Sequence, residues 1–347
     1  MIEKTITFVR LEDTPFGGAE NYLRRVVDEL EKRNIRHKIF HTKTPKWLAS
    51  WIRALWFNHE ATKHKGQQFY FSLSRITCAD IYRASDGVHK AYMKARGKKS
   101  LNPMHWVYLY LEKRCFAHAK RIIAISQFTR QEMIDYYQVD PNKINVIYNG
   151  INMPKYDAKK AKFELCHEFK KDPKLPTVLL VGNGFDRKGA GAFLRMIAKL
   201  ELPVNAFIVG KDKHLSDYQQ LAQSLGIADK VIFTGQRRDI DRFYAAADIF
   251  LYPALYEPFG NVILEALSFG CVVFASDKTG GGELLPKTHR ITATNHAAIL
   301  EQIRSLLVRP NKLKKAQQDA ANIAKRYPVS KNVNETLKVI ETVMGTS

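Results

Sequence analysis

The sequence has little cysteine, no long hydrophobic run and few acidic residues, and each shortage excludes a class of protein. Four cysteines in 347 residues lie far apart, at Cys78, Cys115, Cys166 and Cys271. They form neither a paired metal-binding motif nor a dense disulfide framework, which favours a reducing compartment and argues against structural zinc. No stretch approaches the ~18 consecutive apolar residues of a membrane-spanning helix. Acidic residues come early in the chain and no long apolar core follows, so we expect no signal peptide.

The shortage of acidic residues leaves a strongly basic chain. There are 55 Lys and Arg against 34 Asp and Glu, a formal net charge of +21. Such a charge attracts polyanions: nucleic acid, an anionic membrane face or a phosphorylated substrate. Residues 83–121 hold ten basic and two acidic side chains, so part of the charge is concentrated in one segment. The composition, 45% hydrophobic and 26% charged, is that of a folded globular chain.

Short apolar runs rich in Ile, Val and Phe alternate with amphipathic stretches of helical periodicity. The predicted strands are 6–10, 37–41, 68–73, 121–126, 144–149, 177–182, 204–210, 231–235, 248–253 and 271–276. The predicted helices between them include 18–33, 126–138, 189–200, 214–225, 239–247 and 260–269. This alternation predicts parallel sheets with helices on both faces.

The length suggests two domains. The Lys-rich, proline-bracketed stretch 153–176 is typical of a connection, with one short helix of its own, and a break at 327–328 precedes a final helix. We therefore predict an α/β chain of two doubly wound, Rossmann-like domains. The first comprises residues 1–152 with a helix at 329–347 packed back onto it, and the second comprises 153–328. Such folds bind ligands at the carboxyl ends of their strands, so we expect a cleft between the facing domains to hold the site.

Two glycine-containing turns are candidate phosphate sites. Gly17 and Gly18 join the first strand to a helix whose amides could bind an anion, although an ordinary strand-to-helix turn explains them as well. The segment from Asn183 to Gly189, NGFDRKG, is neither a dinucleotide fingerprint nor a P-loop. It presents Arg187 and Lys188 side by side. A guanidinium, which can donate two parallel hydrogen bonds, and an ammonium, which is a compact charge, together suit a diphosphate. A solvated basic turn is the alternative.

The most informative string is EPFGNVILE, from Glu257 to Glu265, which follows a strand and opens a helix. Pro258 suits the first helical position. The amides that would then point at a ligand are those of Phe259, Gly260 and Asn261. Glu257 would lie in the loop and Glu265 about two turns into the helix. Each carboxylate can accept two hydrogen bonds from a sugar diol, so the pair could hold two sugar rings with a diphosphate between them. The alternative is the general preference of helix N-termini for acidic residues, which explains Glu257 but not the rest of the string.

These motifs resemble glycosyltransferase family 4. The resemblance rests on EPFGNVILE, on PFGG at 15–18, on FDRKG at 185–189 and on the glycine-rich ASDKTGGGELL at 275–285, and it spans nearly the whole chain. It implies a GT-B fold and a retaining, metal-independent enzyme. Within the family, RASD at 83–86 followed by a basic aromatic stretch is most similar to the bacterial lipopolysaccharide core α-1,3-glucosyltransferases that act on inner-core heptose.

The resemblance also implies roles for the donor-binding residues. Arg187 and Lys188 would bind the diphosphate, Glu265 the ribose diol, and Glu257 the hydroxyls of the transferred sugar. The helix amides, with Gly17 and Gly18 of the other domain, would complete a phosphate cradle. Many family members carry Arg where this chain has Asn183, so which group meets the β-phosphate stays open.

Asp86 matches an acidic position near the reacting centre of the core glucosyltransferases, and the resemblance makes it an acceptor-side catalytic group. Capping of the next helix is an equally good interpretation of this residue. No metal site is expected. Asp239 and Asp241 have the spacing of a metal-binding DxD pair, but they begin a predicted helix, where acids are common anyway.

The implied activity is transfer of a hexose from a nucleoside-diphosphate sugar, UDP-glucose or a related UDP-hexose, to a lipid-linked inner-core oligosaccharide of lipopolysaccharide. No cofactor is implied, and no nucleic-acid partner. The implied location is cytoplasmic and peripheral, on the inner face of the cell membrane.

The basic segment 87–121 is the expected membrane contact. Its interleaved aromatic residues are Tyr92, Trp106, Tyr108, Tyr110 and Phe116. Basic residues beside interfacial aromatics suit an anionic leaflet, and the resembled enzymes contact the membrane with this segment. Trp47, Trp51 and Leu55 repeat every four residues, and we expect that stripe to face the core.

Other functions fit the sequence less well. A family 4 enzyme of capsule or glycolipid synthesis is the nearest alternative. A nucleic-acid-binding protein is suggested by charge alone, without an accompanying motif. A nicotinamide dehydrogenase fits the α/β alternation but lacks its glycine fingerprint, and the Glu-x7-Glu spacing disfavours a sugar-phosphate epimerase.

Overall fold

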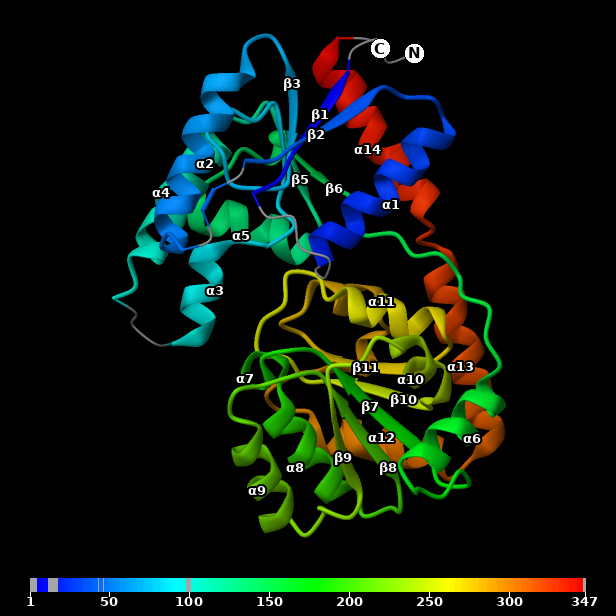
Figure 1. Cartoon of the computed structure of the whole chain (residues 1–347). Helices are drawn as coiled ribbons and strands as arrows, with labels where there is room; N and C mark the ends of the chain where they lie inside the picture. Colours follow the sequence, from blue (N-terminus) through cyan, green and yellow to red (C-terminus); the bar gives the residue numbers. More distant parts are fainter. Residues whose placement is uncertain (1–4, 12–17, 43, 46, 98–100, 346–347) are drawn as a thin grey trace. The chain divides into compact units, whose positions relative to one another are not determined.

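The computed structural model describes residues 5–11, 18–42, 44–45, 47–97 and 101–345 (Figure 1). The chain divides into two compact units. Unit 1 is Met1–Gly150 with Val329–Ser347, and unit 2 is Ile151–Pro328. Each unit contains a six-stranded sheet flanked by helices, and every strand pairing is parallel.

The sheet of unit 1 has the strand order β2-β1-β3-β4-β5-β6. Its strands are β1 (Ile6–Val9), β2 (His37–Phe40), β3 (Phe69–Ser72), β4 (Ile81–Arg83), β5 (Arg121–Ala124) and β6 (Ile144–Val146). Its helices are α1 (Gly18–Lys32), α2 (Ser50–Lys65), α3 (His89–Arg96), α4 (Pro103–His118), α5 (Gln127–Tyr137) and α14 (Val329–Met344), with a 3₁₀ turn, η1 (Pro141–Lys143). Figure 1 shows α1 and α14 on one face and α2 and α4 on the other. A single hydrophobic core joins β1, α1 and α14.

The sheet of unit 2 has the order β12-β11-β10-β7-β8-β9. Its strands are β7 (Thr177–Val181), β8 (Asn205–Val209), β9 (Val231–Gly235), β10 (Ile249–Tyr252), β11 (Val272–Ser276) and β12 (Arg290–Ile291). Its helices are α6 (Ala158–Glu168), α7 (Phe185–Lys188), α8 (Ala190–Leu200), α9 (Leu215–Ser224), α10 (Ile240–Ala246), α11 (Asn261–Ser268), α12 (His296–Leu307) and α13 (Pro310–Lys325), with 3₁₀ turns η2 (Gly280–Leu284) and η3 (Lys287–His289). Helix α6 packs on α10 and α11 on α13, while α8 contacts α9 and α12.

The prediction of parallel sheets flanked by helices is confirmed. All ten predicted runs contain strands, and the six predicted helices are present within about one residue at each end. Two strands were not predicted, β4 and β12. They are only three and two residues long, and each contains an arginine, Arg83 or Arg290, that interrupts the apolar run.

The chain passes between the two units at two neighbouring places. Ile151, the first residue of unit 2, forms an isolated parallel bridge with Pro328, its last residue. The amide of Ile151 donates to the carbonyl oxygen of Tyr327 at 2.9 Å. Both ends of unit 2 are therefore tied together.

The expectation that Trp47, Trp51 and Leu55 face the core is wrong for Trp47 and Leu55, while Trp51 is partly buried. Trp47 is 83% exposed and Leu55 37% exposed, because Trp47 precedes the first residue of α2 and does not share the periodicity of the helix. The helix presents other residues to the core, namely Ala54, Phe57 and Ala61.

Candidate active site

The segment after β7 is one helical turn, α7, held between two glycines. Gly184 precedes the turn and Gly189 follows it, with φ of +75° and +77°. A Cβ on Gly189 would lie 1.9 Å from the carbonyl oxygen of Pro253, so only glycine lets the turn lie against the end of β10. The turn ends with Arg187 and Lys188, which therefore lie at the carboxyl end of the sheet.

Both cations bind one oxygen of Glu257. Arg187 Nη1 and Lys188 Nζ each donate to Glu257 Oε2 at 2.5 Å. The Tyr252 hydroxyl lies 2.7 Å from Lys188 Nζ and donates to the same oxygen at 3.2 Å. A Cβ on Gly182 would lie 2.9 Å from Lys188 Cγ, so this glycine leaves room for the lysine stem. The side chains of Lys188 and Glu257 are 10% and 15% exposed, whereas that of Arg187 is 38% exposed.

The charges of this cluster are strongly coupled. Burial alone would raise the pKa of Glu257, but Lys188 and Arg187 hold that pKa below its usual range. Burial lowers the pKa of Lys188, and Glu257 and Glu265 partly oppose this effect. Two cations share one carboxylate, so the group keeps a net positive charge beside a half-exposed guanidinium. Such a site attracts an anion.

The loop that carries Glu257 is held by the glycine-rich segment after β11. The amide of Glu257 donates to Lys278 O at 3.0 Å, and Gly280 N donates back to Glu257 O at 3.0 Å. Gly281 N donates to Phe259 O at 2.6 Å, and a Cβ on Gly281 would lie 2.6 Å from that oxygen. The glycines of 280–282 therefore allow two backbone segments to approach closely and fix Glu257.

Helix α11 starts within one residue of the predicted range 260–269, but Pro258 is not its first residue. Its first residue is Asn261, and Gly260 before it has a φ of +83°. Pro258 is therefore not at the first helical position, because the positive φ of Gly260 and the bond from Gly281 to Phe259 break the helical path. Glu265 lies four residues after Asn261, about one turn into the helix rather than two.

Glu265 has a different partner from Glu257. The hydroxyl of buried Tyr244 donates to Glu265 Oε2 at 3.1 Å. Burial and the Glu265 carboxylate together raise the pKa of Tyr244 well above its usual range. Tyr244 therefore stays protonated and holds the Glu265 carboxylate in place.

The remaining predicted donor residues are dispersed. Asn183 Oδ1 accepts from the amide of Lys211 at 2.8 Å, so this side chain holds the loop after β8. Gly18 is the first residue of α1 in unit 1, and Gly17 lies outside the described residues. Asp239, which belongs to the DxD spacing and was not predicted to bind the donor, pairs with Arg237 at 2.9 Å.

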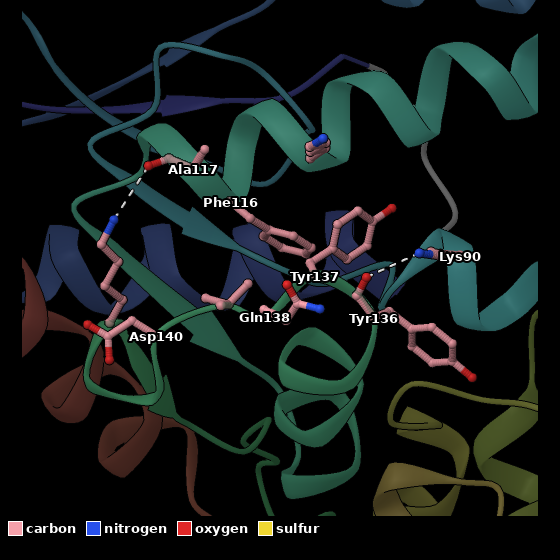
Figure 2. A pocket seen from close by; sticks show the side chains of 10 residues that line it. Lys90, Phe116, Ala117, Tyr136, Tyr137, Gln138 and Asp140 are labelled. Atoms are coloured by element: carbon pink, nitrogen blue, oxygen red, sulfur yellow. Dashed lines mark hydrogen bonds between the residues drawn. The ribbon is translucent and has the colours of Figure 1, made fainter.

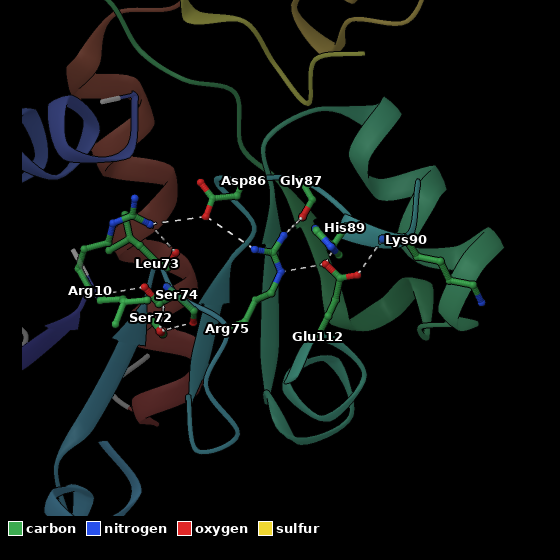
Figure 3. Close-up of polar contacts among 11 residues, drawn as sticks. Arg10, Ser72, Leu73, Ser74, Arg75, Asp86, Gly87, His89, Lys90 and Glu112 are labelled. Carbon is green, nitrogen blue, oxygen red and sulfur yellow. Dashed lines mark hydrogen bonds and ion pairs between the residues drawn. The ribbon is translucent and has the colours of Figure 1, made fainter. Parts of the chain in front are cut away.

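Asp86 lies in unit 1 between two arginines (Figure 3). Its Oδ2 is 3.7 Å from Arg10 Nη1 and 3.7 Å from Arg75 Nη1, and its side chain is 49% exposed. The three residues line a pocket of about 260 Å³, together with Ser74 and Tyr108. A half-exposed carboxylate in a polar pocket can accept hydrogen bonds from a ligand.

Asp86 does not cap helix α3, so that alternative is wrong. The N-cap position is Val88, and its side chain makes no capping bond. Glu112 of α4 caps the helix instead, because its oxygens accept from His89 N at 2.8 Å and Lys90 N at 3.3 Å. The same carboxylate accepts from Arg75 Nε at 3.0 Å and is fully buried. Figure 3 shows this network beside Asp86.

A second pocket in unit 1, about 450 Å³ in volume, lies among lysines and aromatic rings (Figure 2). Two of its lysines are engaged with the ends of helices. Lys90 Nζ donates to Tyr136 O at 3.2 Å, in the last turn of α5, and Lys143 Nζ donates to Ala117 O at 3.4 Å, in the last turn of α4. Part of the concentrated positive charge therefore stabilises helix C-termini.

Sequence reasoning missed two residues that organise these sites, Tyr252 and Glu112. Tyr252 ends a buried strand, and Glu112 lies in an aromatic helix. Their partners Lys188 and Arg75 lie 64 and 37 residues away in the sequence. No local pattern could have predicted these contacts.

No group of three or more His, Cys, Asp or Glu side chains among the described residues is arranged to hold a metal ion. None of the helices within the described ranges is both long enough and apolar enough to cross a membrane.

Family models match both halves of the chain. The model for glycosyl transferases group 1 matches residues 162–324, which include Arg187, Lys188, Glu257 and Glu265. The model for Glycosyltransferase Family 4 matches residues 69–154, which include Asp86.

Individual relatives agree with these models. An uncharacterized glycosyltransferase of Methanocaldococcus jannaschii, MJ1607, is 30% identical over 48% of this chain, which spans 44% of that protein. The lipopolysaccharide glucosyltransferase WaaG of Escherichia coli is 23% identical over 87% of this chain and 88% of its own length. A crystal structure of WaaG has a TM-score of 0.77 at 20% identity, covering 98% of this chain and all of that chain. Anabaena Alr3699/HepE, crystallised with UDP and glucose, has a TM-score of 0.74 at 19% identity, with 98% and 100% coverage.

Proposed function

This chain is a glycosyltransferase of the GT-B type related to family 4, and from that premise we propose that it transfers a hexose from a UDP-sugar to an inner-core acceptor of lipopolysaccharide. The names of two relatives support these substrate classes. WaaG is a lipopolysaccharide glucosyltransferase, and HepE was crystallised with UDP and glucose. The proposed donor is accordingly UDP-glucose or a related UDP-hexose.

The observation that carries the proposal is the sharing of one Glu257 oxygen by Arg187 and Lys188 at 2.5 Å each. A diphosphate offers more negative charge than one carboxylate, so the diphosphate of a bound donor would compete with Glu257 for the partly exposed Arg187 guanidinium. Glu257 keeps both cations charged and oriented before the donor arrives. Preorganised charge of this kind stabilises a transition state with little reorganisation.

The proposed reaction breaks the bond between the sugar C1 and the phosphate oxygen, and the electron pair stays on that oxygen. Arg187 and Lys188 stabilise the departing nucleoside diphosphate, which is more negative in the transition state than in the donor. The acceptor hydroxyl oxygen bonds to C1 on the face that the diphosphate leaves, and its proton passes to the departing phosphate. The configuration at C1 is thereby retained. The two side-chain cations supply the positive charge for this step, so we expect transfer to continue in EDTA.

The other donor contacts follow from the same arrangement. Glu265 would hold the ribose diol, since its carboxylate is fixed by Tyr244 at 3.1 Å. The start of α11 would receive the phosphates at the amides of Phe259, Gly260 and Asn261. Asn183, in the loop between β7 and α7, would complete the phosphate contacts of unit 2.

Unit 1 is the proposed acceptor side. Asp86 would orient the acceptor hydroxyl in the polar pocket that it shares with Arg10 and Arg75. The basic segment 87–121 would bring the enzyme to an anionic membrane that carries the lipid-linked acceptor. The proposed location is peripheral, on the inner face of the cell membrane.

The first test is thermal unfolding of the full chain in EDTA with UDP, GDP, NAD or a short DNA duplex. A ligand at 100 times its dissociation constant adds ~2.7 kcal/mol of stability, so a specific ligand raises the melting temperature measurably. We expect a shift with UDP alone. A shift with NAD or DNA, and none with a nucleoside diphosphate, would overturn the proposal.

The second test identifies the acceptor. A panel of UDP-hexoses is offered with three acceptors: truncated lipopolysaccharide cores, polyprenyl-diphosphate oligosaccharides and diacylglycerol. We expect transfer to the lipopolysaccharide core. Transfer only to the other lipids would replace this acceptor with one of capsule or glycolipid synthesis. The anomeric configuration of the product shows whether the configuration at C1 is retained.

A further inference from the structure

The Tyr252 hydroxyl is the one neutral donor to Glu257 among the side chains that the structure describes. Tyr252 ends β10, and its side chain is fully buried. The loop of Glu257 packs on its ring, because a Cβ on Gly260 would lie 3.5 Å from Tyr252 Cε1. The other two donors are the cations of α7, and the side chain of Arg187 is 38% exposed. The phenol is therefore fixed in place, whereas the guanidinium has room to turn toward solvent.

The two carboxylate oxygens of Glu257 are used unequally. Arg187, Lys188 and Tyr252 all donate to Oε2, at 2.5, 2.5 and 3.2 Å. Within the described ranges of the chain, no side chain donates to Oε1. A carboxylate oxygen accepts hydrogen bonds from hydroxyl groups, so Oε1 can serve a ligand as long as the bonds to Oε2 hold the carboxylate in place.

A bound diphosphate would change this set of donors. It carries more negative charge than a carboxylate and competes for both cations of α7. Tyr252 does not follow them, since its ring is buried and its hydroxyl bears no charge. Burial and the Glu257 carboxylate raise the pKa of Tyr252 well above its usual range, so the phenol keeps its proton. The bond from Tyr252 to Oε2 therefore remains when the cations turn to the diphosphate.

We propose that Tyr252 is a positioning residue for the donor sugar: its hydroxyl holds Glu257 Oε2 while the two cations of α7 bind the diphosphate, so that Oε1 faces the hydroxyls of the transferred hexose. The inference rests on the proposed hexose transfer and adds to it a residue outside the predicted donor set. The same hydroxyl accepts from Lys188 Nζ at 2.7 Å. Tyr252 thus contacts both the group that would bind the sugar and a group that would bind the diphosphate.

Affinities for UDP, UDP-glucose and UDP-galactose, measured by calorimetry on the full chain, separate this role from general support of the site. UDP contains the diphosphate but no hexose, so its binding does not require an oriented Glu257. Tyr252→Phe removes only the hydroxyl. We expect affinity for the UDP-hexose that wild type binds more tightly to fall about tenfold, the typical effect of one hydrogen bond to a charged group, and affinity for UDP to change less than about threefold.

Two other tyrosines of unit 2 provide matched controls. Tyr244→Phe removes a buried hydroxyl that donates to Glu265 at 3.1 Å. It should weaken binding of UDP and of the UDP-hexoses by the same factor, because all of them contain the ribose. Tyr156→Phe removes a hydroxyl that donates to the backbone oxygen of Phe269 at 2.5 Å, and it should leave every affinity at the wild-type value. Circular dichroism and thermal unfolding check the fold of each variant.

The pH dependence of UDP affinity adds a readout that structural support alone would not move. The bond from Lys188 Nζ to the Tyr252 hydroxyl favours the charged ammonium. The other charged groups that act on this ammonium are Arg187, Glu257 and Glu265, and Tyr252→Phe leaves all three in place. We therefore expect the alkaline fall in UDP affinity to move to lower pH in Tyr252→Phe.

A double-mutant cycle tests the route through Glu257. Glu257→Gln removes the carboxylate that Tyr252 would hold, so it should itself lower the ratio of UDP-hexose affinity to UDP affinity. Adding Tyr252→Phe to this variant should lower the ratio no further, because residues that act as one unit are not additive. A further loss of about tenfold in the double variant would show that Tyr252 acts on the hexose by another route, and would overturn the inference.

Two further results would overturn the inference and leave the proposed transfer untouched. One is a Tyr252→Phe variant with the wild-type ratio of UDP-hexose to UDP affinity. The other is an equal loss of both affinities with an unshifted pH profile, which would indicate structural support alone. Failure of the proposed function looks different, because the wild-type chain would then bind neither UDP nor a UDP-hexose, and the inference would fall with it.

Discussion

Glu112 in unit 1 and Glu257 in unit 2 are both carboxylates with little exposure to solvent that bind cations, but their partners are arranged differently. Both oxygens of Glu112 are used: one by Arg75 Nε and His89 N, the other by Lys90 N and Tyr137. In Glu257 three side-chain donors meet on Oε2, and one of them, Arg187, is 38% exposed. Glu112 is fully buried with one cationic partner, whereas Glu257 is 15% exposed and has two. The number and exposure of the cations therefore distinguish a carboxylate that holds a fold from one whose cations can meet a ligand.

The largest loss of stability is expected from removing Glu112, whose two carboxylate oxygens each accept two hydrogen bonds. Glu112→Ala leaves buried Arg75 with only the 3.7 Å contact to Asp86 and removes the cap of α3. Loss of one partner of a buried ion pair typically costs ~3–5 kcal/mol. Urea unfolding followed by circular dichroism measures the loss. Glu112→Gln, which keeps an acceptor oxygen, is the control and should lose less. A free energy of unfolding within ~1 kcal/mol of wild type for the alanine variant would show that the cluster does not stabilise unit 1.

Substitutions around Arg187, Lys188 and Glu257 should lower the transfer activity rather than prevent folding. Lys188→Ala removes charge from the proposed leaving-group site, and removal of one preorganised donor typically lowers kcat by ~10²–10³-fold. Glu265→Ala should also lose most transfer, through weaker donor binding. Initial rates with a UDP-hexose and melting temperatures measure both effects. Retained turnover in both variants would remove these residues from the site.

The pH dependence of donor binding should report the charge of Lys188. Burial lowers the pKa of Lys188 from 10.5, so its charge is lost at a lower pH than that of a free lysine. Donor binding should therefore weaken on the alkaline side, below pH 10.5. Stability has the opposite sign: between the two pKa values the unfolded chain binds more protons, so this group favours folding as the pH rises.

Lys188→Arg is the matched variant for that titration, because a guanidinium stays charged throughout the range. Titration of UDP affinity from pH 7 to 10.5 should show the alkaline fall in wild type and none in the arginine variant. An identical fall in both proteins would assign the titration to another group.

The smallest stability effect is expected at Asp86. Its two arginine contacts are 3.7 Å long and its side chain is 49% exposed, and ion pairs of this kind contribute ~0–1 kcal/mol. Asp86→Asn should unfold like wild type and hydrolyse donor at the wild-type rate, while transfer to the acceptor falls. Equal losses of hydrolysis and transfer would place Asp86 on the donor side instead.

The elements of the fold were readable from the sequence wherever burial gives a periodic pattern. Strands such as Thr177–Val181 are continuous apolar runs, and their alternation with helices predicted parallel sheets. The pattern fails for β4, with three residues, and for β12, with two. It also misled at Trp47, whose four-residue spacing from Trp51 continued beyond the helix.

The candidate site was readable only in part, because its contacts join distant segments. Adjacent basic residues predicted a charged turn at Arg187 and Lys188, but not the Tyr252 hydroxyl, which bonds to both Lys188 and Glu257. Pro258 was wrongly placed at the first position of α11, since the bond from Gly281 that prevents this comes from another loop. The cap of α3 likewise comes from Glu112 rather than from nearby Asp86.

The construction of unit 1 from two ends of the chain has a consequence for synthesis on the ribosome. The core around β1 and α1 includes Val333, Leu337 and Ile340 of α14, which are translated after the whole of unit 2. Domains usually fold in the order of their synthesis, N-terminal first. Unit 2, one uninterrupted segment from 151 to 328, can complete its core while unit 1 still lacks a helix. A nascent chain stalled before Val329 would therefore hold a finished second unit beside an unfinished first one.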